Sequence, residues 1–100
     1  MVLKIIWSPE GVDTYVSILE YLEKEWTDKE VKNFITRVGE KLEILKDQPN
    51  LGRASDKRRN TYRTVINKQI SLIYHYKPIK KEIELLAFWH TSRNPGKLKF

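Results

Sequence analysis

A helical repeat of apolar side chains between residues 31 and 45 limits the possible folds of this chain more than any other feature. Thr27 and Glu30 precede the repeat at the spacing of a capping box, in which the two residues cap each other's backbone N–H groups. The repeat follows the i, i+3, i+4, i+7 rule for one helix face and consists of Val31, Phe34, Ile35, Val38, Leu42 and Leu45. Pro49 cannot continue a helix, so the pattern predicts a helix that ends near Asp47.

A second amphipathic segment comes directly before this helix. Ser8 is a typical N-cap and Pro9 suits the first helical position, which predicts a helix over Pro9–Glu25. Its apolar stripe is formed by Val12, Tyr15, Val16, Leu19, Leu22 and Trp26. Ile18 and Tyr21 lie beside that stripe, so we expect part of this helix to face a partner. The short connection near Thr27 predicts that the two helices form an antiparallel hairpin.

Segments with strand character flank the helical hairpin. Residues 2–7 alternate in polarity and predict an N-terminal strand. Three further segments are rich in β-branched and aromatic residues and are separated by short turns: Tyr62–Asn67, Ile70–Tyr76 and Lys81–Trp89. They predict a three-stranded antiparallel meander, whereas the polar and aperiodic segment Arg53–Asn60 predicts a loop. The expected fold class is α+β with two layers, in which the hairpin covers one face of the sheet.

The length of 100 residues predicts a single domain, 1–100, with one core. We expect that core to contain Leu19, Leu22, Phe34, Ile35, Val38, Leu42, Ile73, Leu85 and Ala87. The chain has no cysteine, and its two histidines lack spaced carboxylates, so we expect neither a metal site nor a cofactor. The longest apolar run, Leu85–Trp89, is far too short to span a membrane. These features predict a cytoplasmic protein.

The formal net charge of +6 favours encounters with nucleic acids and acidic proteins. Lysine and arginine are concentrated after residue 52. Lys57, Arg58, Arg59 and Lys68 are therefore candidates for binding a target or a nucleic acid. A basic surface that only keeps the protein in solution is an equally valid interpretation of the charge alone.

The order of elements and several motifs resemble the RelE/ParE superfamily of bacterial type II toxins. The motifs are Ile5-Ile6-Trp7-Ser8-Pro9-Glu10, the "L–x–x–x–P–x–x–G" segment from Leu45 to Gly52, Ile73-Tyr74, and the "H–x–x–R–x–P" segment from His90 to Pro95. The resemblance covers essentially the whole chain. It implies a toxin that is neutralised by a cognate antitoxin, whose acidic or amphipathic segment wraps around it. Ile18 and Tyr21 are the candidate antitoxin-binding residues.

The resemblance implies one of two activities, which are ParE-like poisoning of DNA gyrase and RelE-like cleavage of mRNA on the ribosome. Metal-independent RNA cleavage needs a proton acceptor, cations around the phosphorane and a general acid. Arg63, His90 and Arg93 are the candidates for these roles. RelE-like nucleases resemble this chain in the central strand but carry an arginine where Ser71 stands here. This departure favours the ParE-like activity, with the endoribonuclease as the alternative.

A third interpretation is a non-catalytic RNA-binding module. The aromatic residues of the expected sheet, Tyr62, Tyr74, Tyr76 and Trp89, could stack on single-stranded bases beside neighbouring cations. Such residues are more often part of a core, and the chain has no glycine–aromatic signature of an RNA-recognition motif.

Overall fold

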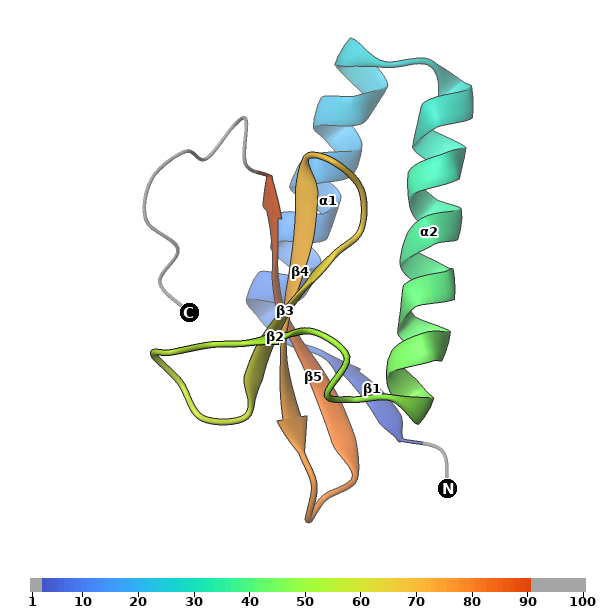
Figure 1. The fold of residues 1–100 in the computed structure, drawn as a ribbon. Helices are drawn as coiled ribbons and strands as arrows, with labels where there is room; N and C mark the ends of the chain where they lie inside the picture. Colours follow the sequence, from blue (N-terminus) through green and yellow to red (C-terminus); the bar gives the residue numbers. More distant parts are fainter. Residues whose placement is uncertain (1–2, 91–100) are drawn as a thin grey trace.

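A computed structural model describes residues 3–90 as two helices packed on a five-stranded sheet (Figure 1). The elements are β1 (Lys4–Trp7), α1 (Pro9–Glu25), α2 (Asp28–Asp47), β2 (Arg53–Ala54), β3 (Thr61–Val65), β4 (Ile70–Lys77) and β5 (Glu82–His90). The sheet order is β1-β5-β4-β3-β2; β1 runs parallel to β5, and the other neighbours are antiparallel. The α+β fold expected from the sequence is confirmed. No helix within residues 3–90 has the length and apolar character needed to cross a membrane.

The two helices begin at the expected caps and form the expected antiparallel hairpin. The Ser8 hydroxyl accepts a hydrogen bond from the Gly11 backbone N–H at 2.9 Å, and Thr27 caps α2 in the same way. Figure 1 shows α1 and α2 side by side and running in opposite directions. The rings of Tyr15 and Phe34 stack between the helices, with centroids 5.8 Å apart. The hairpin is therefore held by apolar contacts along its inner side.

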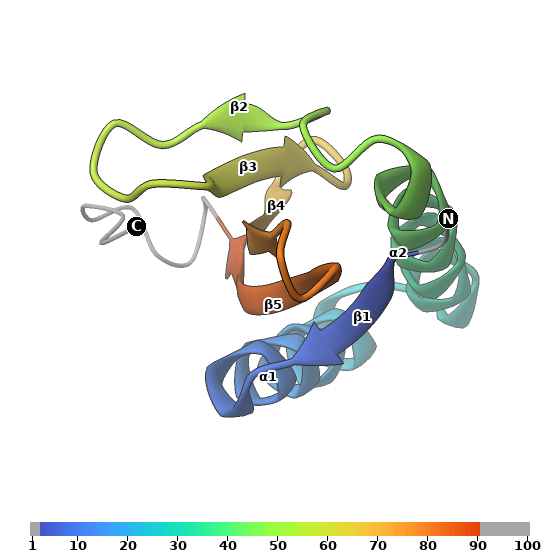
Figure 2. The ribbon, with the colours of Figure 1, turned by 90° about the horizontal axis from the view of Figure 1, so that it is seen from below.

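The sheet has a helix-covered face and an open face. On β4, Leu72 and Tyr74 belong to the core shared with α1 and α2, whereas Ile73 points to the other side. On β5, Leu85 and Phe88 join the same core. Figure 2 shows α2 on the side of the strands away from the β2–β3 loop. We call the side of the sheet that carries Ile73 the open face, because no helix within residues 3–90 covers it, although Ser71, Ile73 and Ala87 on this side are buried.

The start of α1 is bonded to the edge of β5 where β1 ends. Strand β1 pairs with β5 only as far as Trp7, and the register of β5 against β4 then skips Leu86, which forms a bulge. Ser8 donates to the Leu85 carbonyl through its backbone N–H at 3.1 Å and its hydroxyl at 2.7 Å. The Thr14 hydroxyl accepts from the Phe88 N–H at 2.9 Å. Side chains of α1 thus satisfy a strand edge that would otherwise lack partners.

The prediction of which side chains form the core is correct in part. Leu22, Phe34, Val38, Ile73, Leu85 and Ala87 are buried, while Leu19 and Leu42 are half-buried against the core. Ile35 is 45% exposed, so its assignment to the core is wrong. The predicted stripe of α1 is correct in part, since Leu22 is buried and Tyr15, Leu19 and Trp26 pack against the core. The core-facing side is rotated, however, because Ile18 is 3% exposed while Val12 and Val16 are 44% and 46% exposed. Gly11 explains this rotation, since a Cβ there would lie 2.4 Å from the Leu85 carbonyl oxygen and only glycine allows this side of α1 to approach β5.

The segment expected to be a loop contains the short edge strand β2. Arg53 and Ala54 pair with Arg63 and Tyr62 of β3. The hydroxyl of Tyr74 fixes the chain just before β2: it donates to the Pro49 carbonyl at 2.8 Å and accepts from the Gly52 N–H at 3.1 Å. A two-residue strand has no periodicity in the sequence, and for this reason the pattern gave no sign of it.

Substitution of Gly11 by alanine is expected to destabilise the protein by about 1–3 kcal/mol, the usual cost of overpacking. The new Cβ would clash with a backbone oxygen, which cannot move aside as a flexible side chain would. Gly39→Ala in α2 is the matched control, because no atom lies within 4 Å of the added Cβ. It is expected to stabilise the protein by about 0.5–1 kcal/mol through helix propensity. Urea unfolding measures both values, and a stabilising Gly11→Ala would contradict the close approach of α1 and β5.

Removal of the Tyr74 hydroxyl in Tyr74→Phe is expected to cost about 1–3 kcal/mol, because the variant leaves the half-buried Gly52 N–H and Pro49 carbonyl without their partner. Tyr62→Phe is the control, since its hydroxyl bonds only to the exposed Asn50 side chain at 2.8 Å. Thermal unfolding of the two variants should show a clearly larger loss for Tyr74→Phe. Equal losses would mean that Tyr74 does not anchor β2.

Candidate functional site

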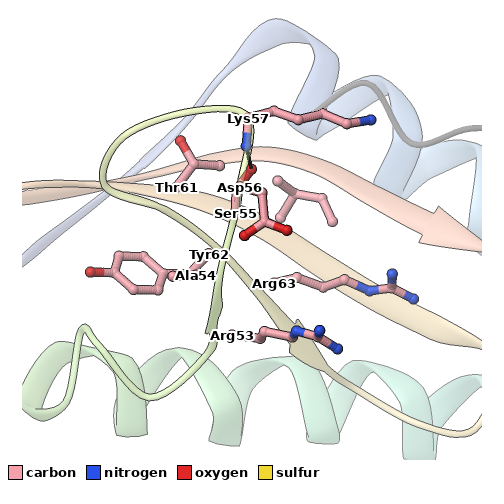
Figure 3. Close-up of a pocket in the computed structure, with 9 residues that line it drawn as sticks. Arg53, Ala54, Ser55, Asp56, Lys57, Thr61, Tyr62 and Arg63 are labelled. Carbon is pink, nitrogen blue, oxygen red and sulfur yellow. Dashed lines mark hydrogen bonds between the residues drawn. The ribbon is translucent and has the colours of Figure 1, made fainter.

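Two arginines lie directly opposite each other on the open face. Arg53 of β2 and Arg63 of β3 are cross-strand partners, and both side chains are exposed. Figure 3 shows both guanidinium groups extending in the same direction from neighbouring strands. They line a hollow of about 210 Å³ together with Lys57 from the β2–β3 loop and Ile73 from β4. We call this feature the basic hollow.

The two arginines of the basic hollow form no ion pair within the described part of the chain, although Asp56 also lines the hollow. Like charges placed directly across a strand pair repel each other and destabilise the pairing. An anion between the two guanidinium groups would remove that repulsion and accept charge-assisted hydrogen bonds from both. The geometry therefore suits a carboxylate or a phosphate.

The loop that supplies Lys57 is held by hydrogen bonds to its own backbone. The Ser55 hydroxyl accepts from the backbone N–H groups of Lys57 at 3.1 Å and Arg58 at 3.3 Å. The Ser55 N–H in turn donates to the Thr61 carbonyl at 2.7 Å, which closes the loop onto β3. Lys57, Arg58 and Arg59 are all exposed on this ordered loop. Of the cations proposed from the sequence to bind a target, Lys57 lines the basic hollow with Arg63.

His75 lies on the same face as Arg63. Its Nδ1 is 3.2 Å from the Thr61 hydroxyl, in the cross-strand pair next to the basic hollow. Burial lowers the pKa of His75 below its ordinary value, and the charges of Lys77 and Arg58 lower it further against the opposing effect of Glu84. The imidazole is therefore neutral at pH 7.

His90 does not meet Arg63. It pairs with Ile70 at the end of β5 and points to the helix-covered face, where it is 0% exposed. Its ring contacts the ring of Tyr21 edge-on, with centroids 4.9 Å apart. His90 and Arg63, two of the candidates for RNA cleavage, are thus on opposite faces of the sheet. Arg93, the third candidate for RNA cleavage, lies outside the described residues.

The remaining candidates lie apart from the basic hollow. Lys68 is exposed in the turn between β3 and β4 and lines a separate hollow of about 360 Å³ with Trp26 and Arg37. Ile18 is buried in the core, and Tyr21 is half-buried against His90. The expectation that Ile18 is exposed for an antitoxin is wrong, because the glycine face of α1 turns it toward β5.

Sequence reasoning missed Arg53, which has a central place in the basic hollow. Arg53 lies in the segment predicted to be an aperiodic loop. The one sequence signal for a close contact with another strand is the glycine directly before it, Gly52. A Cβ on Gly52 would lie 2.8 Å from the Arg63 carbonyl oxygen, so glycine is needed where the chain joins β3. Among residues 3–90, no group of three or more histidine, aspartate or glutamate side chains could hold a metal ion.

Comparison with solved structures shows a shared fold. The chromosomal ParDE system of Pseudomonas aeruginosa matches with a TM-score of 0.71 and 14% identity, over 89% of this chain and 96% of that one. The RelBE2 toxin–antitoxin complex of Mycobacterium tuberculosis matches with a TM-score of 0.61 and 12% identity, over 90% and 99% of the two chains. A free mutant of the Escherichia coli toxin RelE matches with a TM-score of 0.63 and 8% identity, over 95% and 90%.

The sequence itself matches the model of a protein family, described as the ParE toxin of the type II toxin–antitoxin system parDE, over residues 5–95. None of the curated proteins compared with the chain matches it. The family match includes every strand and helix from the middle of β1 to the end of β5. The chain therefore belongs to the ParE toxin family within the RelE/ParE superfamily of type II toxins.

Proposed function

We propose that this toxin stops growth by binding DNA gyrase in the manner of ParE, and that it does not cleave RNA. The observation that carries this proposal is the position of His90 and Arg63 on opposite faces of the sheet. General acid–base cleavage requires the proton-transfer group and the phosphate-binding cations to converge on one reacting centre. A fully buried His90 gives RNA no access to its imidazole.

The position of Ser71 supports the same proposal. Ser71 is buried, opposite Trp89 of β5 and Val65 of β3. RelE-like nucleases carry an arginine at the matching place in their central strand, and the guanidinium would stabilise the charged transition state. A serine hydroxyl supplies no fixed charge, and loss of one such donor typically costs on the order of a hundredfold in rate.

The basic hollow is suited to target binding without catalysis. Arg53 and Arg63 present two guanidinium groups side by side. The apolar Ile73, which is the cross-strand partner of Arg63 on β4, lines the same hollow. Arginine anchors of this kind, on a partly apolar floor, commonly dominate the energetics of protein interfaces. An acidic side chain of the target would fill the position between the two cations. We therefore place target recognition at the basic hollow.

The same proposal includes neutralisation by a cognate antitoxin. The structural neighbours from P. aeruginosa and M. tuberculosis are toxin–antitoxin systems or complexes. On this chain, Val12 and Val16 are exposed one turn apart on α1, and half-buried Leu19 follows them on the same side. An amphipathic antitoxin segment would cover these side chains, and the net charge of +6 would attract its acidic residues.

RNA cleavage is the second candidate function, and the position of His75 favours it. His75 is neutral at pH 7 and shares the open face with Arg63 and Lys57. It supplies the proton acceptor that buried His90 does not. In this form the toxin would be a metal-independent endoribonuclease whose activity depends on His75 in place of His90.

Purified toxin should produce gyrase-dependent breaks in supercoiled plasmid and no codon-positioned cuts in mRNA on translating ribosomes. In Arg53→Gln/Arg63→Gln the yield of breaks should fall at least about tenfold at a fixed toxin concentration, because each lost charge-assisted hydrogen bond is worth about 1.5–3 kcal/mol. Lys29→Gln/Lys32→Gln removes the same charge from the exposed start of α2 and should keep full activity. Messenger RNA cuts that vanish in His75→Ala would overturn the gyrase proposal and establish the second candidate.

Expression of the toxin alone should arrest growth, and co-expression of the antitoxin encoded beside it should restore growth. Val16→Glu places a charge on the proposed antitoxin surface and should weaken the complex at least tenfold, since burying one valine is worth about 1.5–3 kcal/mol. The control is Val65→Glu, which alters an exposed valine on β3. Isothermal titration calorimetry measures both affinities. An unchanged affinity for Val16→Glu would exclude α1 from the antitoxin interface.

A further inference from the structure

The hairpin formed by β4 and β5 projects beyond the rest of the sheet. Strand β3 pairs with β4 only as far as His75, and β1 begins opposite Glu82. The connecting residues 78–81 therefore extend past both neighbouring strands. In Figure 1 the tip of this hairpin lies at the end of the molecule opposite the connection between α1 and α2.

The tip combines a fully exposed apolar side chain with free cations. Ile79 is 96% exposed, far more than any other large apolar side chain that the structure describes. Lys80 and Lys81 follow it directly, and Arg59 approaches from the β2–β3 loop to line a hollow of about 600 Å³ with Ile79. None of these cations forms an ion pair within residues 3–90, whereas Lys77 is paired with Glu84 at 3.3 Å.

The base of the hairpin is anchored on both sides. The Tyr76 N–H donates to the Asn60 carbonyl at 2.8 Å, and the Lys4 N–H donates to the Lys81 carbonyl at 3.0 Å. The ion pair of Lys77 and Glu84 ties the two strands together just before the tip. A ribbon held in this way presents Ile79, Lys80 and Lys81 in a fixed arrangement, so little conformational entropy is lost when they bind.

We propose that the tip of the β4–β5 hairpin binds duplex DNA. A two-stranded β-ribbon fits the major groove of B-form DNA. Lys80 and Lys81 contact the phosphates, and each contact gains affinity through release of bound counterions. Ile79 packs against apolar groups inside the groove, such as the C5-methyl group of thymine.

The size and charge of the tip favour DNA over other anionic partners. A stable protein interface buries about 800 Å² on each side, much more than one isoleucine and a four-residue turn can offer. Attachment to an anionic membrane typically needs a cluster of about 4–8 lysines or arginines. For duplex DNA, in contrast, each lysine or arginine that contacts a phosphate adds to the binding affinity, so two or three cations are sufficient for a measurable contribution.

The first test measures the salt dependence of binding to a short labelled DNA duplex by fluorescence anisotropy, with the full chain alone. Lys80→Gln/Lys81→Asn removes both cations, and asparagine at 81 suits the positive φ of 56°. The slope of log K against log salt should become shallower by about 1.8, or 0.9 for each lost phosphate contact. The matched control Lys29→Gln/Lys32→Gln should leave the slope unchanged, and an equal change in both variants would overturn the proposal.

The second test is Ile79→Ser, which keeps every charge. Its affinity for DNA should fall about tenfold or more while the salt slope stays the same, because only an apolar contact is lost. An unchanged affinity would overturn the proposal. The proposal would also be overturned if Ile79→Ser lost as much affinity for duplex RNA as for DNA, because the deep and narrow major groove of RNA does not admit the ribbon. A variant that lost binding to anionic vesicles but kept its affinity for DNA would overturn it as well. Since gyrase is absent from these assays, their outcome is independent of the proposed target.

Discussion

The junction between the N-terminus of α1 and the bulged edge of β5 is the interaction on which the rest of this structure depends. The Leu85 carbonyl accepts two hydrogen bonds from Ser8, and Gly11 brings the helix axis close enough for Thr14 to bond to the Phe88 N–H. These contacts fix the rotation of α1. That rotation determines which side chains of α1 are in the core and which remain exposed for a partner.

The core on the helix-covered face also determines the geometry of the open face. Tyr74 is buried among core residues, yet its hydroxyl reaches Pro49 and Gly52 and holds the chain for β2. Burial raises the pKa of Tyr74, so the hydroxyl stays protonated and able to donate at physiological pH. Because β2 is held there, Arg53 lies opposite Arg63. The basic hollow on one side of the sheet is thus positioned by hydrogen bonds of a side chain from the other side.

The sequence contained enough information for the elements but not for their contacts. The helices were predictable to within a residue because caps and periodicity are local signals, as at Ser8, Thr27 and Pro49. The precise core-facing side of α1 was not predictable, because it depends on the close approach of Gly11 to β5, a strand that follows more than 70 residues later. The site shows the same division. Arg63 and the loop cations were predictable from charge, whereas the role of Arg53 and the burial of His90 depend on strand pairing and on which face a side chain occupies.

The position of β5 has a consequence for how the protein folds during synthesis. This strand is made last among those described, yet it lies between β1 and β4 and supplies the carbonyl that anchors α1. Contacts between the two ends of a chain form slowly because of their high contact order. A nascent chain that has emerged only as far as β4 lacks the strand that joins β1 to the rest of the sheet. The described sheet is therefore completed only after β5 has been made, more than 70 residues after the helix start that it anchors.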